Sequence, residues 1–317
     1  MNRASGHWWA ELPPAAGAAV MATGIVSIGV HLIGHETFSR VLLAAAVLLW
    51  LVLAVDFATR LVGDHARWEA EADTPPALTA VAATCVLGTR FSLLGRQNLA
   101  TALLALAALL WPLLLYAVVR HWKRRMPGGV FLVCVATQAL AVLAATLAAA
   151  GRGDWLARAA LVLCFLGVLL YLEALVRFDF RQVWTGAGDQ WIAGGALAIS
   201  ALAAAKLTAS PLWTGDTHTV LRKITLVLLG LDLAWYAILL MAEVARPRPG
   251  YDLRRWATVF PLGMAAVATL STAAATHVRG LRTLGEVLQW IAVAAWALTL
   301  GALLFARVRG RGHAARE

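Results

Sequence analysis

The stretch MATGIVSIGVHLIG, residues 21–34, is apolar enough to lie in a membrane, yet it contains Thr23, Ser27 and three glycines. The rest of the 317-residue chain has the same character, with 61% hydrophobic residues, a mean hydropathy of +0.74 and 14% charged residues. Soluble domains carry about 25% charged residues. Apolar runs of about 20 residues cross the hydrocarbon layer as helices, because a helix satisfies its own backbone hydrogen bonds. The sequence therefore predicts an all-α polytopic membrane protein.

Ten apolar runs are long enough to cross a bilayer, and the connections between them are too short to hold another domain. We expect one transmembrane domain that comprises residues 1–317. The ten predicted spans cover about 15–33, 38–62, 75–94, 97–119, 129–150, 155–176, 189–210, 218–243, 253–277 and 284–307.

The formal net charge of +10 comes from basic residues in short clusters between apolar runs, rather than from one basic face. This pattern argues against a nucleic-acid partner and favours topology signals of a chain within a lipid bilayer. Most of the basic residues fall on the side that holds both termini, including RHWKRR at 120–125 and RPRPGYDLRR at 246–255. Because cytoplasmic loops carry an excess of Lys and Arg, we expect a multi-pass protein of the plasma membrane with both termini in the cytoplasm.

Odd-numbered and even-numbered spans differ in composition. Odd spans begin after a proline or a polar run and are rich in Ala, Gly, Ser and Thr, whereas even spans are rich in Leu, Val and Trp. This alternation predicts five helical hairpins. Since bulky helices suit contact with lipid, we expect a quasi-five-fold arrangement with the odd helices inside around a pore and the even helices outside. The alternative is that the small residues only permit close helix packing.

Polar side chains in the interior of the odd spans are candidates for the lining of the centre. They are Thr23, Ser27, Thr84, Thr137, Gln138 and Ser200. Thr23 and Ser27 are one turn apart, which places them on one helix face. We expect these side chains to line a narrow path, although each hydroxyl is equally able to bond back to its own helix.

Two motifs and the hairpin pattern carry a resemblance to a known family. The stretch at 21–34, the five hairpins and RRWATVFPLGMAAVATL at 254–270 resemble the tellurite-resistance/dicarboxylate transporter family. That family includes the plant guard-cell slow anion channels, the yeast-type malate transporters and sulfite exporters. The resemblance implies a pore through five inner helices, a homotrimer with one pore per subunit, and passage of small anions. Such anions include malate and other C4-dicarboxylates. They also include the inorganic anions sulfite, tellurite, chloride and nitrate.

A phenylalanine of the ninth helix blocks the pore in that family, and the matching residue here is Phe260, directly before Pro261. The residues alone also single out this position. Other aromatic residues of the odd spans lie at the span ends, namely Phe91, Phe131, Trp191 and Trp256. A ring in a narrow apolar path excludes water and stops ions, and the adjacent proline removes a helix hydrogen bond, which permits a local kink. The alternative is that Phe260 packs between helices.

Basic residues come near the outer ends of the odd spans. They are His31, Arg90, Arg152, Lys206 and Arg279. A ring of such groups would concentrate anions at the mouth of a pore, and Lys206 is the strongest candidate because it lies roughly one turn inside its span. The alternative for each residue is a long side chain that snorkels to the membrane interface.

Asp232 lies near the middle of the eighth span, where an ionised carboxylate is costly unless it is paired or hydrated. One interpretation is a proton-coupling site in a proton-coupled dicarboxylate or sulfite exporter. The other is a structural residue that is protonated or hydrogen-bonded.

Metal, cofactor and enzyme chemistry have little support in the sequence. Cys85, Cys134 and Cys164 lie in apolar runs without CxxC spacing, which favours packing roles. His31 and His35 have a spacing that suits a metal, but no third ligand is near them in sequence. We therefore expect no metal and no cofactor. Paired acids, HExxH and a Ser with a His partner are not evident, so a membrane enzyme, or a structural or sensory protein, is the less favoured alternative.

Overall fold

The structure is a computed structural model that describes residues 16–63, 73–248 and 252–314. Regular structure in these ranges is helical, apart from an isolated parallel β-bridge between Met126 and Phe178. The long helices are α1 (Gly17–Leu32), α2 (Glu36–Gly63), α4 (Thr79–Leu93), α5 (Gln97–Val119), α6 (Leu132–Ala149), α7 (Asp154–Arg177), α9 (Ile192–Thr208), α10 (Gly215–Ala245), α11 (Trp256–Thr276) and α12 (Leu281–Ala314). The short elements are helix α8 (Gln182–Thr185) and the 3-10 turns η3 (Pro75–Leu78), η4 (Gly128–Phe131), η5 (Asp189–Trp191) and η6 (Leu253–Arg255).

Nine of the described helices are long and apolar enough to cross a membrane. The remaining long helix, α1, is also apolar and has 16 residues. The prediction of an all-α polytopic membrane protein is confirmed. Most predicted span ends fall within three residues of the observed ones, but α12 continues to Ala314, past the predicted end at 307. The predicted start at residue 15 and the two termini, to which the predicted orientation refers, lie outside the described residues.

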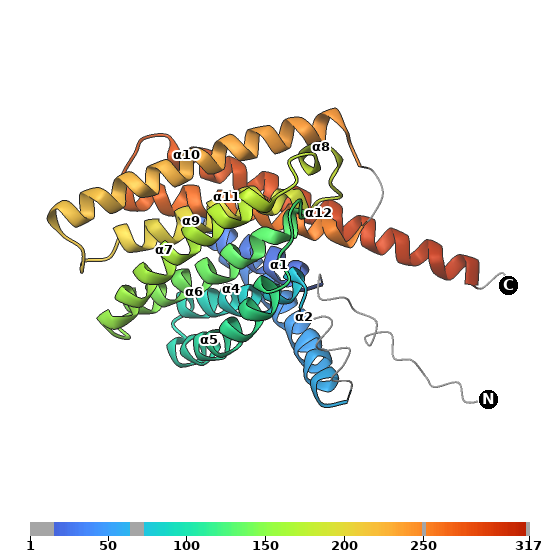
Figure 1. Cartoon of the computed structure of the whole chain (residues 1–317), viewed down its shortest axis with the longest axis horizontal. Coiled ribbons are helices and arrows are strands. Elements are labelled where there is room, and N and C mark those ends of the chain that lie inside the picture. The colour runs from blue at the N-terminus through green and yellow to red at the C-terminus, as the bar shows by residue number, and fades with distance from the viewer. Residues whose placement is uncertain (1–15, 64–72, 249–251, 315–317) are drawn as a thin grey trace.

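The ten long helices form two concentric rings, as the alternating composition predicted. Helices α1, α4, α6, α9 and α11 each pack against the next, and α11 packs against α1, which closes the inner ring. Helices α2, α5, α7, α10 and α12 lie outside it, and each contacts its own hairpin partner and one neighbouring inner helix. In Figure 1 the colour passes around the ring in chain order, and the red helices return to the blue α1.

The two rings differ in burial. In the four longer inner spans, between 78% and 100% of the most apolar window is buried, against 17% to 33% in the outer helices. Exposed side chains on the outer ring include Leu48, Leu109 and Val162. Because lipid tails are as apolar as these side chains, the outer ring presents the surface that suits a bilayer.

The sequence repeat has a structural counterpart at the start of the inner helices. Helices α4, α6, α9 and α11 each follow a 3-10 turn, from η3 to η6. Two of these turns pass very close to each other, because a Cβ atom at Gly128 in η4 would collide with the backbone of Asp189 in η5. Glycine at 128 therefore lets the starts of α6 and α9 come together.

Candidate functional site

The five inner helices enclose a cavity in the half of the ring that holds their carboxyl-terminal ends. Its empty space, including the part open to solvent, is about 430 Å³. Every inner helix contributes to its wall, which consists of Ile25, Ile28, Leu32, Cys85, Val86, Thr89, Leu93, Ala139, Val142, Ile199, Leu202, Lys206, Met264, Val267 and Ser271. Among these lining residues Lys206 alone is charged. The cavity is therefore an apolar chamber with one basic group.

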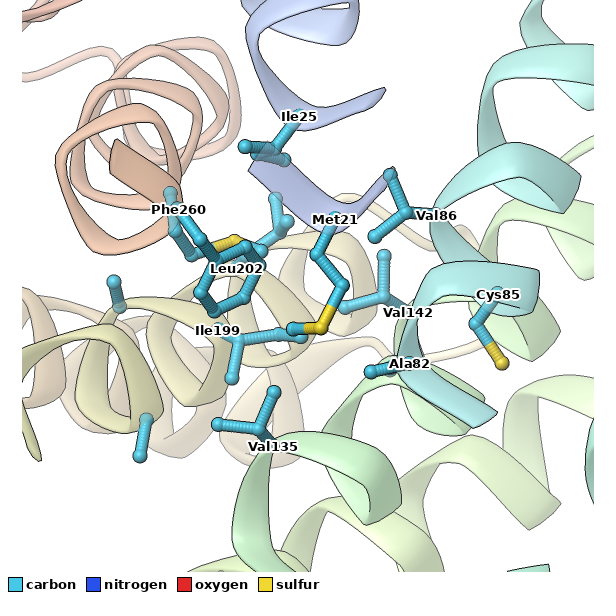
Figure 2. Packing of buried hydrophobic residues seen from close by; sticks show 14 of the residues in the cluster. Met21, Ile25, Ala82, Cys85, Val86, Val135, Val142, Ile199, Leu202 and Phe260 are labelled. Carbon is cyan, nitrogen blue, oxygen red and sulfur yellow. The ribbon is translucent and has the colours of Figure 1, made fainter. Parts of the chain in front are cut away.

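Phe260 lies one helical turn before the part of α11 that lines this cavity. Met264, Val267 and Ser271 of α11 line the cavity at helical spacing, and Phe260 comes one turn before Met264 on the same face. Its side chain is buried, with 2% exposed. Figure 2 shows the Phe260 ring and the side chain of Met21 pointing into the middle of the inner ring. Met21 in turn comes one turn before the lining residue Ile25, so Met21 and Phe260 occupy equivalent positions on α1 and α11.

Helices α9 and α11 approach each other closely at Pro261, next to Phe260. Helix α11 is continuous from Trp256 to Thr276 with Pro261 inside it. A Cβ atom at Gly195 of α9 would lie 2.9 Å from Cγ of Pro261, which is closer than side chains normally approach. Gly195 is therefore needed for the contact between the two helices beside Phe260.

The hydroxyl groups that the sequence suggested for the pore lining point elsewhere. Three of them accept a hydrogen bond from the indole N–H of a tryptophan on the outer ring. The pairs are Trp296 with Thr23 (3.0 Å), Trp50 with Thr84 (2.9 Å) and Trp111 with Thr137 (2.9 Å). Each bond joins an outer helix to the first helix of the next hairpin, and the pair from α12 to α1 joins the last hairpin to the first.

Of the other three predicted lining residues, Ser27 and Gln138 bond to neighbouring helices and Ser200 bonds within its own helix. Ser27 donates to the carbonyl of Ser39 on α2 (2.7 Å), and Gln138 donates to the carbonyl of Cys164 on α7 (3.0 Å). Ser200 donates to the carbonyl of Ala196 on its own helix (2.7 Å). None of the six lines the described cavity. These side chains bond to protein groups instead, because polar groups in an apolar interior are most stable where they find hydrogen-bond partners.

Sequence reasoning missed the aliphatic residues that do line the cavity. On α1 they are Ile25, Ile28 and Leu32, and on α9 they include Ile199 and Leu202. The signal was a larger apolar residue at every third or fourth position of a helix otherwise rich in Ala and Gly.

The five basic residues predicted to form a ring lie in different surroundings. Lys206 lies in the cavity wall. Arg90 is fully buried and bonds to Glu36 (2.9 Å) and to the hydroxyl of Ser39 (3.0 Å), so its charge is compensated. His31 lies 2.6 Å from the same carboxylate. Arg152 and Arg279 are exposed and do not line the cavity. Glu36, which the sequence analysis did not single out, is thus the acid that organises this end.

Asp232 is buried between the rings rather than in the cavity wall. Its carboxyl is 1% exposed, and within the described residues its Oδ2 has no hydrogen-bond partner. The hydroxyl of Tyr236, within electrostatic range of Asp232, likewise has no hydrogen-bond partner among the described residues. Gly194 on α9 is a neighbour of this carboxyl, since a Cβ there would lie 4.0 Å from Oδ1, an ordinary van der Waals distance.

A charged cluster lies at the opposite end of the ring, where the inner helices begin. Glu243 bonds to Arg248 and to Arg255 (2.8 Å). Asp252 accepts bonds from the Arg254 side chain, at 2.7 Å for the shortest, and these hydrogen bonds hold the pKa of its carboxyl below the usual range. The cluster fixes the connection between α10 and α11.

Potential metal ligands do not gather in the described part of the chain. No group of three or more His, Cys, Asp or Glu side chains is close enough there to hold a metal ion. Cys85, Cys134 and Cys164 are free, buried thiols. Only Cys85 of the three lies in the cavity wall.

These features define the class of protein: a polytopic helical membrane protein with two rings of helices and an apolar cavity inside the inner ring. The voltage-dependent anion channel family matches residues 11–304, which is nearly the whole chain. The chain therefore belongs to the voltage-dependent anion channel family, as the resemblance of residues 21–34 and 254–270 predicted. Membership implies anion transport across a membrane and places the chain among channels and transporters.

Two curated proteins share a shorter similarity with this chain. Both are uncharacterised membrane proteins of Mycobacterium tuberculosis, from strains CDC 1551 / Oshkosh and ATCC 25618 / H37Rv. Each is 37% identical over 54 residues, which cover 17% of this chain and 27% of the relative. The match thus spans about a quarter of the length of these relatives and indicates no substrate.

Proposed function

We propose that the chain conducts small anions along the axis of the inner ring and that Phe260 closes this path. The observation that supports the gate most directly is its position: Phe260 lies on the face of α11 that lines the cavity, at the level where the cavity ends. An aromatic ring in an apolar constriction keeps water out, and an ion cannot pass where it loses its hydration. Pro261 beside it leaves one helix hydrogen bond unmade, which eases movement of this segment.

Small anions are the proposed substrates, and the candidates are malate and other C4-dicarboxylates, sulfite, tellurite and inorganic anions. Lys206 provides positive charge next to the path. With both termini in the cytoplasm, as the basic clusters predict, the cavity opens to the outside of the plasma membrane. The family resemblance further supports a homotrimer in which every subunit has its own path.

The gate is tested by electrical recording of purified protein in lipid bilayers. Phe260→Ala removes the ring, and we expect a folded protein whose anion current is about tenfold or more above that of wild type. Phe131→Ala is the matched control. Phe131 is equally buried but packs against Tyr171 and Phe178, at ring-centroid distances of 5.2 and 5.3 Å, so its truncation opens nothing on the axis.

If Phe260 only packs between helices, its truncation costs about 3–5 kcal/mol of stability, as for other buried phenylalanines, without raising the current. A well-folded Phe260→Ala protein with wild-type or lower current would therefore refute the gate.

A proton-coupled exporter is the second candidate, and Asp232 is the observation that favours it. In the described part of the chain this buried carboxyl has an unpartnered Oδ2 and lies near the unpartnered hydroxyl of Tyr236, so it is a site where a proton can be held. Purified protein in liposomes with an imposed pH gradient separates the channel from the proton-coupled exporter. Malate uptake that follows the gradient and disappears in Asp232→Asn supports coupled transport, whereas flux that follows voltage alone supports the channel.

A further inference from the structure

Lys206 differs from the other basic residues at its end of the ring. Arg90 is paired with Glu36, and Arg152 and Arg279 are exposed away from the cavity. Lys206 lies in the cavity wall, and in the described part of the chain no acid or hydrogen-bond acceptor is paired with its ammonium group. An unpaired cation beside an apolar cavity is costly unless a counter-ion joins it.

The backbone of the inner helices makes the electrostatic potential at the cavity more negative. The carboxyl-terminal ends of all five inner helices point toward the half of the ring that holds the cavity. Each such end carries roughly half a negative charge on its free carbonyl groups. The outer helices begin at this end, but they lie one layer further from the cavity. Lys206 therefore offsets a negative potential that would otherwise repel an anion.

We propose that Lys206 and the hydroxyl of Ser271 hold one monovalent anion in this cavity, so that the chain carries nitrate or chloride in preference to dicarboxylates. This inference rests on the proposed anion path and adds the charge of its substrate. Ser271 is free to donate, since its hydroxyl has no partner among the residues that the structure describes. The Thr89 hydroxyl, in contrast, donates to the carbonyl of Cys85 (2.9 Å).

The preference follows from charge balance. One lysine neutralises one negative charge. The second charge of a dicarboxylate would lie against side chains such as Ile28, Val142, Leu202 and Val267, which offer no hydrogen bonds. A charge without compensation in apolar surroundings is strongly unfavourable. Monovalent anions meet no such cost.

The test uses the full-length chain in proteoliposomes, both as wild type and with Phe260→Ala. Fluxes of nitrate and malate are compared for Lys206→Met, which keeps the length and apolar stem of the side chain, and for Lys206→Arg, which keeps the charge. Lys223→Met is the matched control, because Lys223 is exposed on the outer helix α10. Thermal unfolding of each variant in detergent, with and without nitrate, reports folding and anion binding separately from transport.

We expect nitrate flux to exceed malate flux about tenfold or more, and Lys206→Met to lower nitrate flux by a similar factor. Lys206→Arg retains most of the nitrate flux, and Lys223→Met leaves it unchanged. Nitrate raises the unfolding temperature of wild type but not of Lys206→Met, and malate raises neither.

Equal nitrate and malate fluxes, or a folded Lys206→Met protein that conducts nitrate as wild type does, overturn the monovalent site while leaving the anion path intact. No flux of either anion, together with a nitrate effect on unfolding that requires Lys206, contradicts the transport function and supports the site. The absence of both effects overturns both.

Discussion

Arg90 shows how this protein accommodates a buried charge. Its side chain is fully buried, and Glu36 and Ser39 bond to two of its nitrogens, while Nη1 has no partner in the described structure. Glu36 also bonds to Arg40 (2.8 Å) and His31, so one carboxylate serves three basic groups. A buried guanidinium depends on its carboxylate more than an exposed one does. Removal of the charge on Glu36 should therefore destabilise the protein.

Glu36→Gln should lower the stability of the folded protein by about 2–3 kcal/mol. This value lies below that for breaking a fully buried pair, because 36% of the Glu36 side chain is exposed and the charge is partly screened. Glu286→Gln is the matched control, since Glu286 pairs with the exposed Arg282 over one helical turn (3.0 Å) and its loss costs about 0–1 kcal/mol. Thermal unfolding in detergent measures both. Equal losses would contradict the role of Glu36.

At the scale of the helices, composition predicted the architecture but not which way the polar groups face. Small and large residues alternate from span to span, and this alternation was sufficient to place odd helices inside and even helices outside. It did not reveal that Thr23 and Thr84 turn toward Trp296 and Trp50 of the outer ring. An inner helix is apolar on all sides. Its sequence therefore shows which residues share a helix face, but not which face points toward the axis of the ring.

Tertiary contacts also decided which candidates belong to the site. Phe260 stood out in the sequence because it is an aromatic residue well inside a small-residue helix, and in the structure it lies one turn before the lining residue Met264, with its ring among the buried side chains of the inner helices. The partnership of Arg90 with Glu36 joins residues 54 positions apart, and no local pattern shows it. Among the described residues Lys206 has no such partner, and only the structure distinguishes the two basic residues.

The contact between α9 and α11 gives a prediction at the same scale. Gly195→Ala should destabilise the protein by about 1–2 kcal/mol, because the new Cβ would lie 2.9 Å from the rigid ring of Pro261. Gly230→Ala on α10 has nothing within 4 Å, so it should be neutral or stabilise by up to about 1 kcal/mol through helix propensity. Thermal unfolding should therefore shift in opposite directions, and a stabilising Gly195→Ala would show that the helices are not in close contact.

At the scale of the whole molecule, closure of the ring explains why the cavity is central. Each outer helix contacts the inner helix of the next hairpin, and α12 contacts α1 in the same way. Two further bonds support this joint, from Trp296 to Thr23 and from Gln289 to the carbonyl of Val26 (3.2 Å). Since every inner helix has neighbours on both sides, the axis is reached only through the two ends of the ring.

The side of the membrane to which each end faces is the last prediction. Because successive helices are antiparallel, the basic connection at 120–125 lies at the end where the inner helices begin, and the cavity with Lys206 lies toward the other end. The positive-inside rule then places 120–125 in the cytoplasm and the cavity toward the exterior.

Two single-cysteine variants at exposed positions test this orientation. They are His121→Cys, within the basic cluster, and Thr217→Cys, at the start of α10. The wild-type chain, whose three thiols are buried, is labelled in parallel as the control for its native cysteines, including Cys85 in the cavity wall. In intact cells a membrane-impermeant maleimide should label Thr217→Cys, and His121→Cys should react only after the membrane is opened. The reverse pattern would turn the cavity toward the cytoplasm, and anions would then reach Lys206 from inside the cell.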